Sequence, residues 1–170
     1  LFLKVNRKKT EVAHFSKVKY LGYAFYAYKG KCRFRVHPKS VAKMKDKIRE
    51  LTDRNRGISN EEREEKYQAY VRGWANYFKL ADMKGLMRRT DEWVRRRIRA
   101  VYWKQWKKIK TKYRMLKALG LEDWKAKELA NSRKGYWRMA QVLNQVFSNK
   151  IIVKLGYTSM LDYYLIVYEN

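Results

Sequence analysis

In the stretch from residue 68 to 114, aromatic rings alternate with guanidinium and ammonium groups at helical spacing. Trp74 and Phe78 come first, and an arginine-rich run that contains Trp103 and Trp106 follows them. Cations neutralise phosphates, while flat rings and guanidinium planes stack on exposed bases. This combination of residue types is suited to holding RNA or an RNA–DNA duplex.

Each candidate also has a simpler explanation. A run of charges on a helix is usually a solvated surface, but here two tryptophans lie within the run and few acids interrupt it. We expect Trp74 and Phe78 in the core, which leaves Arg72 and Asn76 to face a nucleic-acid backbone; Asn76 can equally cap a neighbouring turn. The candidate nucleic-acid-binding residues are Lys43, Lys47, Arg54, Arg72, Asn76, Arg88, Arg95, Arg96, Arg99, Trp103, Trp106, Lys107, Arg133, Lys134 and Arg138.

The composition agrees with a polyanionic partner. The chain has 170 residues, with 42 lysines and arginines against 16 acids, for a formal charge of +26. Such a surplus opposes compaction unless a polyanion binds, so nucleic acid is the expected partner. The apolar content of 46%, with 15% aromatic residues, predicts a packed structure rather than disorder.

Several other classes of protein are disfavoured. One cysteine, Cys32, allows no internal disulfide, and with only two histidines there is no plausible zinc site. No apolar run approaches the length of a membrane span, and no signal peptide pattern is present. The chain starts at Leu1 inside a predicted strand, so we expect it to be a piece of a longer protein.

The first 36 residues have the pattern of β structure. Residues 2–6 alternate apolar and polar side chains, and residues 18–28 and 32–36 flank a Lys-Gly-Lys turn. Glycine at such a turn supplies the positive φ of a hairpin. In the last stretch, one set of side chains is expected to face the core and the other to form a cationic surface: Cys32, Phe34 and Val36 against Arg33 and Arg35.

Helical periodicity begins after Pro38, which can occupy a first helical turn. An apolar stripe predicts the first helix, and Ser59 with the acids after it predicts the start of a second. The third helix is predicted at 86–108, with Trp93 on its core face and Arg88, Arg95, Arg99, Trp103 and Trp106 on another. Shorter helices are predicted at 113–119, 121–130, 135–147, 148–155 and 159–168. The predicted fold class is mainly α: an N-terminal strand and hairpin, a three-helix thumb-like bundle, and a tail of short helices.

Several separated motifs resemble one family. Residues 70–78, with Arg72-Gly73-Trp74 and Asn76-Tyr77-Phe78, are similar to the maturase-specific helix of bacterial group II intron reverse transcriptases, also called maturases. The resemblance covers the whole chain and keeps the order of the motifs. The other matching stretches lie at 3–10, 20–23, 91–107, 130–138 and 159–164.

The resemblance implies three regions and a primer-binding hairpin. These are the end of a polymerase palm at 1–37, a helical thumb or maturase domain at 38–114, and a short DNA-binding tail at 115–170. Tyr20, Leu21 and Gly22 resemble the hairpin that grips the primer, and Asn6 and Lys9 resemble residues near the polymerase active site. A bulge at Gly22 and a solvated turn lysine at Lys9 are the simpler alternatives.

The resemblance also implies the chemistry of the parent protein, an RNA-directed DNA polymerase that uses Mg²⁺. Such polymerases hold two metal ions with adjacent aspartates, and this chain has no Asp-Asp pair. The acids between Glu61 and Glu65 are explained as a helix start. We therefore expect no catalytic residue, no metal site and no cofactor in this chain, and no polymerisation by it alone.

The partners implied are group II intron RNA, an RNA–DNA template–primer duplex and target DNA, with no membrane, in the bacterial cytoplasm. The alternative is a free-standing structural RNA-binding protein without enzymatic activity, which should not begin with a polymerase-like strand and hairpin. A basic membrane-surface protein is less favoured, because the cations are interleaved with rings over a broad face.

Overall fold

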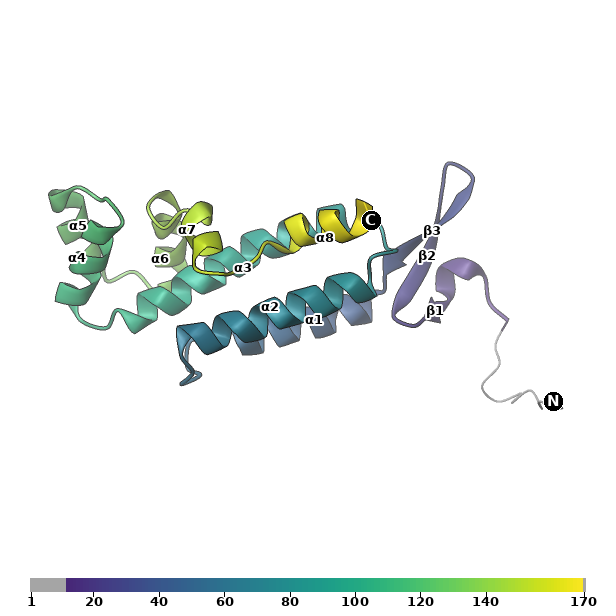
Figure 1. Ribbon diagram of the computed structural model, residues 1–170, viewed down its shortest axis with the longest axis horizontal. Helices are drawn as coiled ribbons and strands as arrows, with labels where there is room; N and C mark the ends of the chain where they lie inside the picture. Colours follow the sequence, from purple (N-terminus) through teal and green to yellow (C-terminus); the bar gives the residue numbers. More distant parts are fainter. Residues whose placement is uncertain (1–11, 170) are drawn as a thin grey trace.

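The computed structural model describes residues 12–169, so the predicted strand at 2–6, Asn6 and Lys9 lie outside the described residues. A small antiparallel sheet lies at one end of the molecule, and long helices run away from it (Figure 1). The prediction of a mainly α fold with a short β element in front is confirmed.

The sheet has the strand order β1-β2-β3, with β1 at Lys19–Tyr20, β2 at Tyr23–Tyr28 and β3 at Lys31–Val36; a short 3₁₀ turn, η1, precedes it at Phe15–Lys17. The turn predicted between β2 and β3 is present, with φ of 49° at Lys29 and 73° at Gly30. Two positive φ values in a two-residue loop match the twist of a hairpin. Only Val36 of the three predicted core residues of β3 is buried, because no described helix covers Cys32 and Phe34.

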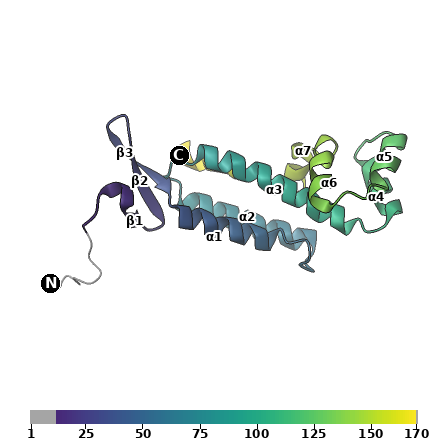
Figure 2. The ribbon, with the colours of Figure 1, turned by 180° about the vertical axis from the view of Figure 1, so that it is seen from behind.

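Three long helices follow: α1 at Pro38–Leu51, α2 at Asn60–Tyr77 and α3 at Lys84–Gln105. The His37 Nδ1 accepts from the Lys39 N–H at 3.1 Å, and the Ser59 Oγ accepts from the Glu62 N–H at 3.1 Å. These bonds satisfy backbone donors that the first turn of a helix leaves without partners. Helices α1 and α2 lie side by side beneath α3 (Figures 1 and 2).

The remaining helices are short: α4 at Ile109–Ala118, α5 at Asp123–Ala130, α6 at Tyr136–Val142, α7 at Asn149–Lys154 and α8 at Met160–Glu169. A 3₁₀ turn, η2 at Leu143–Gln145, continues α6. Helices α4 and α5 pack on each other beyond the end of α3, whereas α6 and α8 pack on α3 itself. Helix α8 returns along α3, so the C-terminus lies near the sheet (Figure 1).

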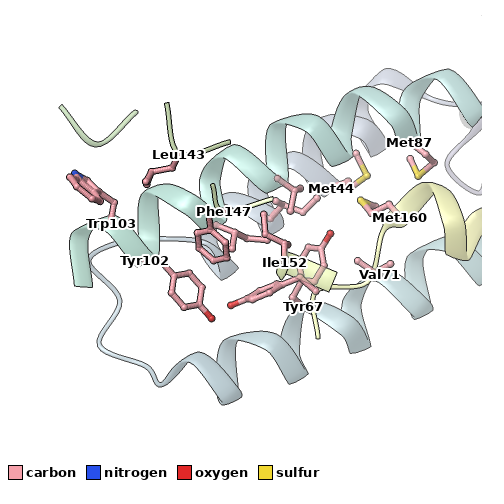
Figure 3. Packing of buried hydrophobic residues seen from close by; sticks show 14 of the residues in the cluster. Met44, Tyr67, Val71, Met87, Tyr102, Trp103, Leu143, Phe147, Ile152 and Met160 are labelled. Atoms are coloured by element: carbon pink, nitrogen blue, oxygen red, sulfur yellow. The ribbon is translucent and has the colours of Figure 1, made fainter. Parts of the chain in front are cut away.

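One hydrophobic core joins these elements. Met44 of α1, Val71 of α2 and Met87 of α3 meet in the space between the helices, together with Phe147 and Met160 from the C-terminal part (Figure 3). All five are buried, and burying a side chain of this size stabilises the fold by about 1.5–3 kcal/mol. Trp74 and Phe78 are buried as predicted. The C-terminal helices therefore complete the core of the three-helix bundle.

Asp91, on α3, anchors the start of α8. Its buried carboxylate accepts hydrogen bonds from the Ser159 Oγ at 2.7 Å, the Met160 N–H at 2.8 Å and the Leu161 N–H at 3.0 Å. The carboxylate thus satisfies donors of the first turn of α8 from a different helix.

Burial, with a contribution from Asp91, raises the pKa of Tyr67, so this phenol is neutral at physiological pH.

Candidate nucleic-acid interface

Two guanidinium groups lie near the ring of Trp93, on α3. The Cζ of Arg49, on α1, is 5.6 Å from the centre of the indole ring, and the Cζ of Arg97 is 5.2 Å from it. Lys45 and Arg89 line the same shallow pocket as Trp93. Cations at this distance over a ring are attracted by its electron-rich face. This side of α1 and α3 therefore presents a ring among four cations.

Two more stacks extend this surface to α6. The Arg54 Cζ is 5.1 Å from the ring centre of Tyr136, and the Arg96 Cζ is 4.1 Å from that of Trp137. Tyr136 is 42% exposed and Trp137 is 40% exposed. Helix α1, which carries part of this surface, lies toward the viewer in Figure 2. We call the whole surface the α1–α3–α6 face; it consists of Lys45, Arg49, Arg54, Arg89, Trp93, Arg96, Arg97, Tyr136 and Trp137.

Hydrogen bonds hold two of these guanidinium groups in place. The Arg97 Nε donates to the Thr52 Oγ1 at 2.6 Å, and its Nη2 donates to the Arg49 carbonyl at 3.2 Å. The Arg96 Nε and Nη2 donate to the Trp137 carbonyl at 3.2 and 3.1 Å. Burial, then the charges of Arg49 and Arg54, lower the pKa of Arg97. The face is therefore organised before any ligand binds.

Acids neutralise only part of the face. The Arg49 Nη1 pairs with Asp46 at 2.5 Å, and Glu50 pairs with Lys47 at 2.7 Å and Arg56 at 2.8 Å. Hydrogen bonds from Lys47 and Arg56 lower the pKa of the Glu50 carboxyl. The other five cations of the face, Lys45, Arg54, Arg89, Arg96 and Arg97, form no ion pair with another residue between 12 and 169.

Three predicted interface residues are buried in the structure. Arg99, Trp103 and Trp106 are 4%, 2% and 6% exposed. Phe147, in the segment that follows α6, accounts for two of them: its carbonyl accepts from the Arg99 Nε at 2.7 Å, and its ring stacks on that of Trp106. The C-terminal segment folds back over this side of α3 and covers it.

The structure distributes the other candidates over several surfaces. Arg54 and Arg96 belong to the α1–α3–α6 face, and Arg95 lies beside it. Arg72 donates to the Gln68 Oε1 at 3.4 Å and Asn76 to the Tyr163 Oη at 3.1 Å, and no described contact links either to that face. Lys47 is exposed and pairs with Glu50. The six other candidates are exposed and form no ion pair with a described residue: Lys43, Arg88, Lys107, Arg133, Lys134 and Arg138.

Reasoning from the sequence missed Lys45, Arg49, Arg89, Trp93 and Arg97. Arg89, Trp93 and Arg97 are spaced at i, i+4 and i+8 and therefore share one side of a helix. Lys45 and Arg49 have the same spacing on α1. A ring with a cation four residues away on each side is the signal that identifies this site.

The predicted primer-binding turn is a second exposed feature. Leu21 and Gly22 have φ of 48° and 85° and divide β1 from β2 by a two-residue turn, so Gly22 does not accommodate a bulge. The Gly22 carbonyl accepts from the His37 N–H at 2.9 Å and the Ser40 Oγ at 3.1 Å, and the Tyr77 Oη donates to the Leu21 carbonyl at 2.9 Å. The turn is thus held by α1 and α2.

Replacing Gly22 tests this attachment. A Cβ at Gly22 would lie 3.0 Å from the Ser40 Oγ and 3.1 Å from the Phe78 Cζ, whereas one at Gly30, with φ of 73°, would meet nothing within 4 Å. Gly30→Ala should lower the free energy of unfolding by about 1 kcal/mol, the cost of a left-handed residue. Gly22→Ala should lower it by about 2–4 kcal/mol, because crowding adds to that cost. If urea denaturation gave the same loss of unfolding free energy for both variants, the turn at Gly22 would not be packed against the helices.

Exposed rings stacked with guanidinium groups on a strongly basic helical fold are features of nucleic-acid-binding proteins. Residues 41–120 match the family model of the group II intron maturase-specific domain. These residues therefore form a group II intron maturase-specific domain, which indicates a maturase-related RNA-binding function. The match includes Lys45, Arg49 and Trp93 of the α1–α3–α6 face, while Tyr136 and Trp137 lie beyond it. No curated protein matches the chain.

Two further observations concern metal ligands and membrane-spanning helices. Within residues 12–169, no three His, Cys, Asp or Glu side chains gather where they could hold a metal ion. None of the helices in this range is both long and apolar enough to span a bilayer.

Proposed function

We propose that the α1–α3–α6 face binds group II intron RNA during splicing and retrohoming. The observation that carries this proposal is the row of ring–guanidinium stacks beside cations that lack carboxylate partners, within and next to the maturase-specific domain. Free cations neutralise phosphates, and the exposed rings offer surfaces to bases. The ribozyme supplies the splicing chemistry, and the protein holds the RNA in its active shape.

A second role follows for the parent protein, a reverse transcriptase in this proposal. Helices α1–α3 clasp the template–primer duplex as a thumb, and the turn at Leu21 and Gly22 contacts the primer end. Tyr20 and Leu21 are 64% and 63% exposed, and the turn is held rigidly by α1 and α2. Target DNA is a further proposed partner of the segment after residue 115.

Recognition of the duplex would rest on its shape. The major groove of an A-form duplex is too deep and narrow for side chains to read, so contacts go to phosphates and sugars. Arginine and lysine suit this role because they bind phosphate oxygens without regard to base sequence. The face therefore suits a structured RNA better than a particular base sequence.

The salt dependence of RNA binding tests this proposal. The six cations of the face can each contact one phosphate, and each contact adds roughly 0.7–0.9 to the slope of log affinity against log salt concentration. Since Asp46 competes for Arg49, we expect a slope between about −3 and −5 for this chain on a folded intron RNA, measured by filter binding or fluorescence anisotropy. A slope near zero would contradict binding through phosphates.

A further inference from the structure

A pocket beside the α1–α3–α6 face has the features of a phosphate site. It lies between α3 and the α6–α7 segment, and Arg95, Arg96 and Arg99 line it together with one carboxylate, that of Glu92. The amide side chains of Gln141, Asn144 and Asn149 also line it. Three guanidinium groups against one carboxylate leave the pocket positive, and the amides offer further hydrogen-bond donors. We call this hollow the α3–α7 pocket.

Arg99 forms the fixed wall of the pocket. Its side chain is buried, with Nε donating to the Phe147 carbonyl at 2.7 Å and Nη2 donating to the Asn149 Oδ1 at 2.7 Å. No carboxylate in the described part of the chain pairs with it. Burial, then the charge of Arg95, lower the pKa of Arg99 to about 10, so it remains charged at neutral pH. A buried charge without a counter-ion favours binding of an anion nearby.

Arg95 and Arg96 complete the pocket in different ways. Arg95 is partly exposed and makes no hydrogen bond or ion pair with another described residue, so its guanidinium is free to bind. Arg96 lines the pocket and also stacks over Trp137, 4.1 Å from the ring centre. Because Arg96 lines the pocket and also stacks on Trp137, the pocket and the indole ring are adjacent.

Trp137 provides a surface for a base. One face of its ring is covered by Arg96, and the residue is still 40% exposed. An indole exposed to this extent can stack on a base, and a guanidinium over the ring adds to the stack. The bases inside a duplex already stack on their neighbours, so only an unpaired base can use this surface.

We propose that the α3–α7 pocket and Trp137 together bind one unpaired nucleotide of the RNA, with its phosphate at Arg95 and Arg99 and its base on the indole ring. This inference rests on the proposed function, and it specifies the kind of RNA structure that the protein binds. The ligand is a duplex interrupted by a bulged or looped-out nucleotide, with the regular part of the duplex lying on the cations of the α1–α3–α6 face.

The test compares two RNA hairpins that differ by one bulged adenosine, together with a third hairpin in which that position is abasic. The 170-residue chain should bind the bulged hairpin at least about fivefold more tightly than the uninterrupted and abasic hairpins, in line with measured base–aromatic stacking. Trp137→Ala should remove most of this preference, because it should weaken binding of the bulged hairpin more than binding of the uninterrupted one. Arg95→Gln should weaken binding of the bulged hairpin more than that of the uninterrupted one.

Controls separate stacking from loss of structure. Trp124, on α5, is 63% exposed and no guanidinium of residues 12–169 lies over its ring, so Trp124→Ala should keep the preference. Trp137→Phe keeps a flat ring and should retain most of the preference for the bulged hairpin. If the unmodified chain binds all three hairpins equally, or if Trp137→Ala keeps the preference, the inference fails while the proposed function stands. If the chain binds none of them, both fail.

Discussion

Replacing Lys45, Arg54 and Arg89 together with glutamine should lower the affinity for structured RNA by at least about 30-fold near 0.1 M salt. These three cations form no ion pair with a described residue, so their removal leaves no acid without a partner. Loss of three phosphate contacts should also reduce the magnitude of the salt slope by roughly two to three. Both quantities come from one series of fluorescence anisotropy titrations at several salt concentrations.

A second triple variant with the same change in charge is the control. Lys79, which follows α2, Lys117 on α4 and Lys154 on α7 are exposed, form no ion pair with a described residue, and belong to no part of the α1–α3–α6 face. Their replacement with glutamine should change the affinity by less than about threefold, because only the general field of the protein is reduced. Equal losses in the two variants would indicate that RNA responds to the net charge of +26 rather than to one face.

Asp91→Ala should lower the free energy of unfolding by about 3–5 kcal/mol. The change leaves three donors, at Ser159, Met160 and Leu161, without their acceptor in a buried position. Each unsatisfied buried donor costs about 1–3 kcal/mol, although water entering the space recovers part of this. The loss should detach α8 first, because Asp91 is the group that caps its first turn.

The neighbouring Glu92 supplies the control for Asp91. It is exposed and makes no ion pair with a described residue, so Glu92→Ala should change the free energy of unfolding by less than about 0.5 kcal/mol in urea denaturation. Hydrogen exchange can follow the amides of α8 in the Asp91 variant. If α8 keeps its protection there, packing rather than the carboxylate holds this helix.

Local patterns predicted the long helices well. The stripe of Met44, Ile48 and Leu51 is buried on α1, and Ser59 caps α2 as its position before a run of acids indicates. The turn at Gly30 also follows from its own residue type. These features depend on residues close together in the chain, so the sequence contains the information directly.

Long-range packing buries some of the residues that were predicted to bind nucleic acid. Arg99 and Trp106 were predicted to share one side of the third helix, and nothing in that helix itself indicates that Phe147 will contact both residues. Trp93 packs against the core as its position on the apolar face of α3 predicts, but the two guanidinium groups over its ring were not predicted. Periodicity identifies which residues share a face, but the neighbour of each face is decided by how distant segments pack. The described contacts do not test the domain boundaries at 37 and 114, which stay predictions.

Ultraviolet crosslinking of bound RNA, with the crosslinked residues identified by mass spectrometry, tests the location of the interface most directly. Aromatic side chains that stack on bases are the expected sites of crosslinking, and the chain carries exposed rings on several surfaces. We expect crosslinks at Trp93, Tyr136 and Trp137. Crosslinks concentrated at Trp124 of α5 or Tyr28 of β2, with none on the α1–α3–α6 face, would contradict the account.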